Sequence, residues 1–275
     1  MAILTCNFLS PSLMRTVPLT AILPTDTFSP FEPTNQEAGN FKTLYLLHGF
    51  LGNHTDWVNH TRLLDYASQK KLCVVMPSGE NHFYINHPTS GEKYSSYLVD
   101  DLIDFVQKSF PVSNKREDTF IGGLSMGGYG AIVNGLKHSD KFSHICALSS
   151  ALVFDTILQA TDETQGPFSR TYYQTTFGDL DMLAGSENDY DFLVENYPTE
   201  KEKPRVYLAC GEEDDLLQAN EVFRNKLSQF DFDVTWSKTA GGHNWQFWDQ
   251  QIEAVLRWLP LEGTEASISS GNVSL

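Results

Sequence analysis

The stretch that decides the fold is Gly123-Leu124-Ser125-Met126-Gly127. Residues 118–122 before it have the length and apolar content of a short buried strand, and small and apolar residues recur at helical spacing over 128–136. A G-x-S-x-G sequence between a strand and a helix is typical of a nucleophile elbow, a strained turn that exposes the serine hydroxyl at the end of a sheet. An ordinary Gly/Ser turn is the alternative, but these flanks favour the elbow. The pattern therefore predicts Ser125 as a nucleophile.

Apolar runs alternate with helical patterns along the rest of the chain. Continuous apolar runs are typical of strands covered on both faces, and this alternation predicts a mostly parallel central sheet with helices on both faces. Strands are expected at 43–47, 72–76, 118–122, 144–148, 205–210 and 232–236, and helices near 61–71, 98–109, 128–136, 217–229 and 248–259. Two earlier runs, 2–9 and 15–23, predict an antiparallel N-terminal edge. The predicted fold class is α/β.

Neither an internal repeat nor a clean linker interrupts this pattern, so we expect one domain over residues 1–261. Within it, the aromatic and acid-rich segment 151–200 is expected to be irregular, and we interpret it as a cap-like insertion over the site. The Pro- and Ser-containing stretch 24–40 is expected to be an exposed loop. The small, polar residues 262–275 predict a disordered tail.

The composition argues against several classes of partner. Of the 275 residues, 35 are acidic and 19 are basic, and the net charge of −16 argues against binding to nucleic acid or to anionic membranes. No stretch approaches the roughly 20 apolar residues that span a bilayer, and residues 1–7 lack the features of a signal peptide. Scattered cysteines suit free thiols in a reducing compartment. We expect a cytoplasmic protein that acts on a small molecule, and a homo-oligomer is compatible with these features.

A serine hydroxyl needs a base to become a nucleophile, and the base is usually a histidine oriented by a carboxylate. In sheets with a nucleophile elbow, the acid and then the histidine follow the serine along the chain. His243 lies between the last expected strand and the last expected helix, and Gly241 and Gly242 let its loop approach Ser125. We predict His243 as the base and expect the remaining histidines to be surface or packing residues.

The acid is expected in the turn after the strand 205–210. Four acidic residues compete there: Glu212, Glu213, Asp214 and Asp215. We predict Asp214 as the partner of His243, with Asp215 as the second choice. The alternative is that all four form a solvated acidic turn and that the orienting carboxylate lies elsewhere.

A tetrahedral intermediate needs N–H donors for its oxyanion. The backbone of Met126, directly after the nucleophile, is one candidate. The second is expected in the loop after the strand 43–47, where Gly49 lets the backbone turn in and Phe50 supplies the N–H, with Leu51 as the alternative donor. His48 is interpreted as a structural residue that holds this loop.

Aromatic residues near these motifs are candidates for the walls of a substrate pocket, although core packing explains them about as well: Trp57, Phe83, Tyr84, Tyr94, Tyr97 and Trp245. The sequence contains no H-E-x-x-H, no paired cysteines and no phosphate-cradling glycine loop. We therefore expect no metal site and a reaction that needs no cofactor.

Together these motifs resemble the esterase D / tributyrin esterase branch of the α/β-hydrolases. The resemblance lies in LYLLHGFLGN (44–53) with Trp57, YSSYLVDDL (94–102), GGLSMGGYGA (122–131), CGEEDDLL (210–217) and GGHNWQFW (241–248). It implies an α/β-hydrolase fold and a serine carboxylesterase that hydrolyses short-chain acyl esters, acetyl to butyryl, including acetyl groups on sugars. It also implies Ser125, Asp214 and His243 as the triad and Phe50 and Met126 as oxyanion donors. Asp215 departs from the family, which more often has an aromatic or amide side chain there.

The same triad is compatible with other activities. S-formylglutathione hydrolases are similar and would use it on a thioester, and an acyltransferase would use it with an alcohol in place of water. A non-catalytic binding protein on the same fold is a further alternative, because fold alone does not determine function. The ordered set Ser125, Asp214 and His243 argues against that last alternative, since binding does not require it.

Overall fold

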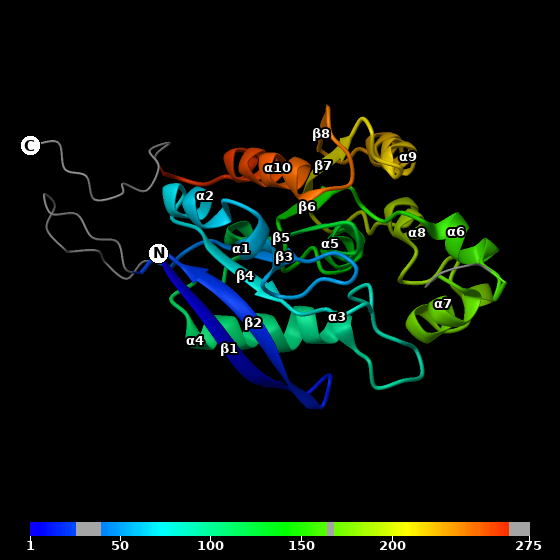
Figure 1. Ribbon diagram of the computed structural model, residues 1–275, viewed down its shortest axis with the longest axis horizontal. Coiled ribbons are helices and arrows are strands. Elements are labelled where there is room, and N and C mark those ends of the chain that lie inside the picture. Colours follow the sequence, from blue (N-terminus) through cyan, green and yellow to red (C-terminus); the bar gives the residue numbers. More distant parts are fainter. Residues whose placement is uncertain (26–39, 164–167, 264–275) are drawn as a thin grey trace, which may run out of the picture.

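One sheet organises the structure, a computed structural model that describes residues 1–25, 40–163 and 168–263. Its strands are in the order β1-β2-β4-β3-β5-β6-β7-β8 (Figure 1). β1 pairs antiparallel with β2 and β2 with β4, whereas the pairs from β4 to β8 are parallel. The predicted parallel sheet with an antiparallel N-terminal edge is confirmed. The strands are β1 (Ala2–Ser10), β2 (Arg15–Leu23), β3 (Thr43–Leu47), β4 (Cys73–Pro77), β5 (Thr119–Leu124), β6 (His144–Leu148), β7 (Arg205–Gly211) and β8 (Val234–Thr239).

The central strands are buried on both faces, which explains their continuous apolar sequences. In β3, Tyr45 and Leu47 belong to one hydrophobic core and Leu44 and Leu46 to the other, because successive side chains of a strand point to opposite faces. The first core is covered by α4 (Ile103–Ser109), α5 (Met126–Lys137) and α9 (Leu217–Gln229), and the second by α1 (Asp56–His60), α2 (Leu63–Gln69) and α10 (Trp245–Trp258). α3 (Tyr94–Ser96) continues through a π-helical turn (Tyr97–Leu102) into α4, and a 3-10 turn (Arg116–Asp118) precedes β5.

The segment 151–200 is more regular than expected. It contains α6 (Phe154–Gln159), α7 (Arg170–Phe177), a 3-10 turn (Leu180–Met182) and α8 (Tyr190–Glu195), and the three helices gather on one side of the molecule (right in Figure 1). The side chains of Ser169 and Asp189 cap α7 and α8 by accepting hydrogen bonds from backbone N–H groups. Helices this short span too few turns to show a clear apolar period, so the sequence pattern does not reveal them.

Helix boundaries elsewhere also differ from expectation. The helix expected near 61–71 is α2, and the short helix α1 before it was not expected. α10 begins at Trp245 because the side chain of Asn244 accepts a hydrogen bond from the backbone N–H of Phe247. Most of the expected loop 24–40 and tail 262–275 lies outside the described residues. Among the helices of the described part of the chain, none is long and apolar enough to cross a membrane.

Candidate active site

Ser125 stands in a strained turn between β5 and α5. Its φ of 53° and ψ of −118° are rare for a residue with a side chain and are maintained only where the surroundings enforce them. A Cβ on Gly123 would lie 2.5 Å from the carbonyl oxygen of Gly127, and a Cβ on Gly127 would lie 2.5 Å from that of His48. Both glycines are therefore required for this close packing of strand, helix and the loop after β3.

His243 reaches Ser125 from the loop between β8 and α10. Its Nε2 lies 3.0 Å from Ser125 Oγ. This loop packs closely against the end of β7, because a Cβ on Gly211 would lie 2.0 Å from the carbonyl oxygen of Gly241. Gly241 itself has a φ of 135°, a conformation that favours glycine. The glycines around this loop therefore permit the approach of the imidazole to the serine.

Asp214 is the carboxylate that meets the histidine. Its Oδ2 lies 3.0 Å from His243 Nδ1, and its Oδ1 accepts a hydrogen bond of 2.9 Å from the backbone N–H of Leu216. Burial favours the neutral acid, but hydrogen bonds from His243, Leu216 and the Ser149 hydroxyl outweigh it and hold the pKa of Asp214 below its usual value. An ionised Asp214 fixes the proton on Nδ1 and leaves Nε2 free to accept one from Ser125. Asp215 is exposed and lines a different cavity, whose lining does not include His243.

Two backbone N–H groups stand beside the serine without a partner in the described part of the chain, those of Phe50 and Met126. Met126 is the first residue of α5, where a helix N–H has no intrahelical acceptor, and the positive end of the helix dipole lies there. The N–H of Leu51, the alternative donor, is taken by Asn81 Oδ1 at 2.9 Å. The geometry thus favours Phe50 over Leu51 as the second donor.

His48 holds the loop that carries Phe50. The backbone N–H of Gly79 donates to His48 Nε2 at 2.9 Å, so the ring proton is on Nδ1, which donates to the carbonyl oxygen of Gly49 at 2.7 Å. Burial lowers the pKa of His48 and keeps the ring neutral. The hydroxyl of Tyr84 donates to the His48 carbonyl oxygen at 3.2 Å. His48 therefore has the structural position that the sequence suggested.

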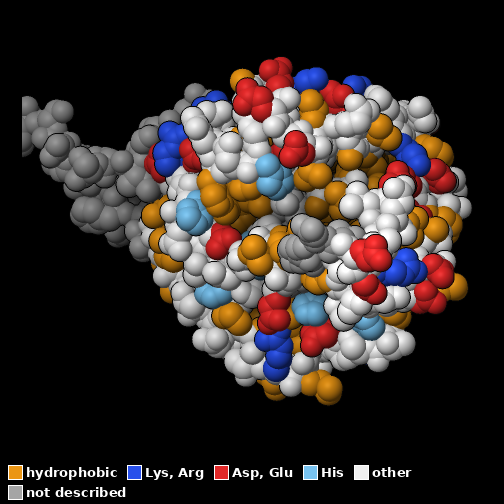
Figure 2. All heavy atoms as spheres, turned by 45° about the vertical axis from the view of Figure 1, so that its right-hand side comes forward, with side chains coloured by type: hydrophobic (Ala, Val, Ile, Leu, Met, Phe, Trp, Pro, Cys, Tyr) orange, Lys and Arg blue, Asp and Glu red, His pale blue; other side chains and the backbone are white. Residues whose placement is uncertain are grey.

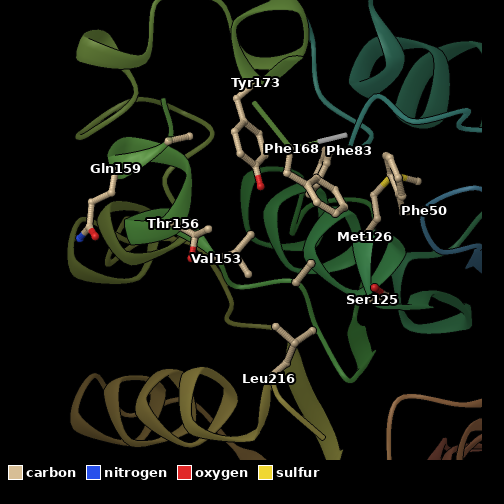
Figure 3. A pocket seen from close by; sticks show the side chains of 12 residues that line it. Phe50, Phe83, Ser125, Met126, Val153, Thr156, Gln159, Phe168, Tyr173 and Leu216 are labelled. Atoms are coloured by element: carbon tan, nitrogen blue, oxygen red, sulfur yellow. The ribbon is translucent and has the colours of Figure 1, made fainter. Parts of the chain in front are cut away.

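Two cavities meet at Ser125, and both are also lined by Phe50 and Phe168. The cap-side cavity has a volume of about 570 Å³ and is mostly apolar, and Figure 3 shows its lining: Phe50, Phe83, Ser125, Met126, Ala151, Val153, Thr156, Gln159, Ala160, Phe168, Tyr173 and Leu216. The histidine-side cavity has a volume of about 620 Å³ and is lined by Gly49, Phe50, Leu51, Gly52, Asp56, Leu124, Ser125, Phe168, His243, Asn244, Trp245 and Trp248. Figure 2, turned toward the side that carries α6 and α7, shows hydrophobic side chains inside a hollow.

The predicted pocket walls are only partly correct. Phe83 lines the cap-side cavity and Trp245 lines the histidine-side cavity, but Trp57, Tyr84, Tyr94 and Tyr97 are buried elsewhere. The polar atoms of Trp57, Tyr84 and Tyr94 have structural partners. Trp57 donates to the carbonyl oxygen of Leu47, Tyr84 holds the loop after β3 as described above, and the Tyr94 hydroxyl accepts from Arg15. These three residues therefore stabilise the protein core and the loops near the site and do not line either cavity.

Sequence reasoning missed the residues of the segment 151–200 that line the cap-side cavity. Val153, Phe168 and Tyr173 come from this segment, and Phe168 lies between the two cavities. The apolar and aromatic residues inside this otherwise acidic segment are the signal that could have indicated them. No group of three or more His, Cys, Asp or Glu side chains placed to hold a metal ion occurs in residues 1–25, 40–163 and 168–263.

The strand order, the serine elbow after β5 and the histidine loop after β8 define an α/β-hydrolase-type fold. The fluorophosphonate-binding serine hydrolase F of Staphylococcus aureus has the same fold, with a TM-score of 0.83 and 32% identity, and the match covers 94% of this chain and 98% of that one. An S-formylglutathione hydrolase of Staphylococcus aureus matches with a TM-score of 0.80, 32% identity and the same coverage.

The sequence comparison gives the family. A family model described as "Putative esterase" matches residues 12–259, and the chain belongs to this esterase family. An acetyl esterase of Caldicellulosiruptor saccharolyticus is 40% identical over 261 residues, which cover 94% of this chain and 98% of that protein.

Proposed function

We propose that this protein is a serine carboxylesterase of the esterase D / tributyrin esterase type that hydrolyses short-chain acyl esters, acetyl to butyryl. The observation that carries the proposal is the hydrogen-bonded chain from Ser125 through His243 to Asp214, beside the unpartnered N–H groups of Phe50 and Met126. Membership of the esterase family and the 40% identity to an acetyl esterase support it.

The geometry accounts for each step of ester hydrolysis. His243 Nε2 takes the proton of Ser125 as Oγ bonds to the ester carbonyl carbon, and the carbonyl oxygen becomes an oxyanion that the N–H groups of Phe50 and Met126 stabilise. His243, held by ionised Asp214, then gives its proton to the alcohol oxygen as the ester C–O bond breaks. Water next attacks the carbonyl carbon of the acyl-enzyme and gives a proton to His243 Nε2. His243 returns this proton to Ser125 Oγ as the bond between Oγ and the acyl carbon breaks, which releases the carboxylic acid and restores the enzyme.

The direction of proton transfer assigns the two cavities to the two parts of the ester. The alcohol oxygen must receive its proton from His243, so the alcohol belongs in the cavity that contains this histidine. That cavity combines the rings of Trp245 and Trp248 with the polar side chains of Asn244 and Asp56. Aromatic faces beside a few polar groups suit an alcohol with both apolar faces and hydroxyl groups, which supports an acetylated sugar as substrate.

Hydrolysis of p-nitrophenyl acetate and butyrate by the wild type and by Ser125→Ala tests the proposal. We expect rapid release of p-nitrophenol that falls by at least about 10³-fold in the variant, because the residual rate depends on oxyanion stabilisation and binding alone. Activity that survives the substitution would show that Ser125 is not the nucleophile. Acetate release from acetylated sugars would then test the alcohol.

S-formylglutathione hydrolysis is a second candidate, favoured by the 32% identity and 0.80 TM-score to the Staphylococcus aureus enzyme of that name. It would use the same serine on a thioester. Measuring kcat/KM for S-formylglutathione beside p-nitrophenyl acetate separates the two candidates, and a strong preference for the thioester would replace the carboxylesterase proposal. Product analysis with added methanol distinguishes hydrolysis from acyl transfer.

A further inference from the structure

We propose that the cap-side cavity is the acyl site and that it accepts acyl chains beyond butyryl, of about six to eight carbons. This inference rests on the proposed serine esterase function and extends its acyl range beyond butyryl, because it assigns the acyl specificity to α6 and its neighbours. The cap was expected to lie over the site, and the cavity walls on α6 and at Tyr173 on α7 give it a specific part in substrate selection.

Only one of the two cavities contains His243, the residue that protonates the alcohol part of an ester. Both contain Ser125 and Phe50, but His243 lines only one of them. In the tetrahedral intermediate the leaving oxygen faces His243 and the oxyanion faces the N–H groups, so the acyl substituent points away from the histidine. The cap-side cavity, which His243 does not line, is therefore the space that we assign to the acyl group.

The size of this cavity exceeds what an acetyl group needs. A water molecule takes up about 30 Å³ of liquid, and a methyl or methylene group is of similar size, so about 570 Å³ holds on the order of ten or more such groups. An eight-carbon chain would fill about half of the space. A cavity built for acetyl alone would be closed within a few ångströms of Ser125.

The chemistry of the lining also suits an alkyl chain. Around Ser125 the walls are Phe50, Met126 and Leu216, followed by Val153. Figure 3 shows Thr156 and Gln159 of α6 on the side of the cavity opposite Ser125, and both are exposed. An acyl chain would thus contact apolar side chains along most of its length. Only the end of the chain, beside Thr156 and Gln159 of α6, would reach solvent.

The first test is a chain-length series of p-nitrophenyl esters from acetate to dodecanoate. A buried methylene is expected to raise kcat/KM by a factor of up to about four. We therefore expect kcat/KM for hexanoate and octanoate to be at least equal to that for butyrate. A fall of tenfold or more between butyrate and hexanoate would overturn the proposal. Loss of Ser125-dependent cleavage of every ester would instead overturn the esterase function itself.

The second test uses a substitution on α6 that reduces the volume of the cap-side cavity. Thr156→Trp adds a large ring at an exposed position that lines the cavity, whereas Asp155→Trp adds the same ring at the neighbouring exposed position, which does not line it. We expect the octanoate-to-acetate ratio of kcat/KM to fall at least tenfold in Thr156→Trp and to stay within twofold of wild type in Asp155→Trp. Equal ratios in all three proteins would contradict the assignment.

A matched alcohol series checks which end of the ester the cavity holds. Ethyl, butyl, hexyl and octyl acetate keep the acyl group constant and vary the alcohol. Thr156→Trp should change the chain-length profile of the p-nitrophenyl alkanoates and leave that of the alkyl acetates as in wild type. The reverse result would show that the cap-side cavity binds the alcohol, and the acyl assignment would be wrong.

Discussion

The indole N–H of Trp248 donates a hydrogen bond to the hydroxyl of Ser149 over 3.1 Å. Ser149 is also among the groups that lower the pKa of Asp214, and the ring of Trp248 meets His243 edge-on with 4.9 Å between centroids. Trp248 and Ser149 thus act together on the acid and the base of the candidate triad. Residues that orient the groups around a reacting centre limit how far these groups can move away from productive geometry.

Ser149→Ala is expected to lower kcat/KM by about tenfold and to move the loss of activity that follows protonation of Asp214 to higher pH. A hydrogen bond to a charged group contributes about 1.5–3 kcal/mol, and its loss raises the pKa of Asp214, so the carboxylate is protonated at a higher pH than in wild type. A pH profile of p-nitrophenyl acetate hydrolysis measures both effects. Ser150→Ala is the matched control, because within the described residues its hydroxyl has no partner. Identical profiles for Ser149→Ala and Ser150→Ala would contradict this account.

Asp214→Asn and Asp215→Asn are expected to differ by orders of magnitude in kcat. An amide at position 214 no longer fixes the proton on His243 Nδ1, and loss of the correct tautomer in a serine–histidine–aspartate triad costs on the order of 10⁴ in rate. Asp215 is exposed and should change kcat less than twofold. Steady-state kinetics of the two variants measures this difference in kcat. A larger loss of kcat in Asp215→Asn than in Asp214→Asn would show that Asp215 is the partner of His243.

The fold and the order of the triad could be predicted because both depend on local features of the sequence. The runs 44–47 and 120–124 consist of apolar residues, tyrosine and glycine, which predicts strands buried on both faces. The elbow at Ser125 needs glycines at fixed spacing, and these are visible in the sequence. By contrast, the choice between Asp214 and Asp215 depends on a turn in which the Asp214 N–H bonds to the Gly211 carbonyl oxygen.

The pocket walls could not be predicted because they depend on contacts between distant segments. Tyr84 has the composition of a pocket residue, but its φ of 57° and its bond to the His48 carbonyl oxygen turn it into the core. Phe168 has little strand or helix pattern around it, yet it lies between both cavities. The direction in which such a side chain points is determined by the tertiary structure and cannot be derived from the spacing of residues in the sequence.

Gly127→Ala is expected to destabilise the protein by about 1–3 kcal/mol or more and to reduce activity with it. The added Cβ would meet the carbonyl oxygens of His48 and Leu47 at 2.5 and 2.6 Å, and backbone atoms have little room to move. Urea unfolding compares this variant with Gly91→Ala, whose Cβ would meet no atom closer than 4.0 Å. Equal stability of the two variants would show that the elbow tolerates a side chain at position 127.

His144 makes folding stability depend on pH at the end of the sheet opposite to Ser125. It is buried at the start of β6, and burial, with the nearby charges of Arg205, Arg116 and Lys42, lowers its pKa from 6.5 to about 4. Between these pH values the unfolded chain binds a proton that the folded chain does not. The stability that neutral His144 provides is therefore complete above about pH 6.5 and is lost as the pH falls toward 4.

His144→Gln is expected to flatten this dependence. In wild type the group contributes a slope of up to about 1.4 kcal/mol per pH unit, and glutamine cannot be protonated in this range. Urea unfolding at pH 7, 6 and 5 measures the slopes, and the wild type should lose more stability than the variant over this range. Because His144 lies far from the carboxyl ends of the strands, kcat at pH 7 should remain that of wild type. Parallel stability curves would mean that His144 has the same proton affinity in the folded and unfolded chains.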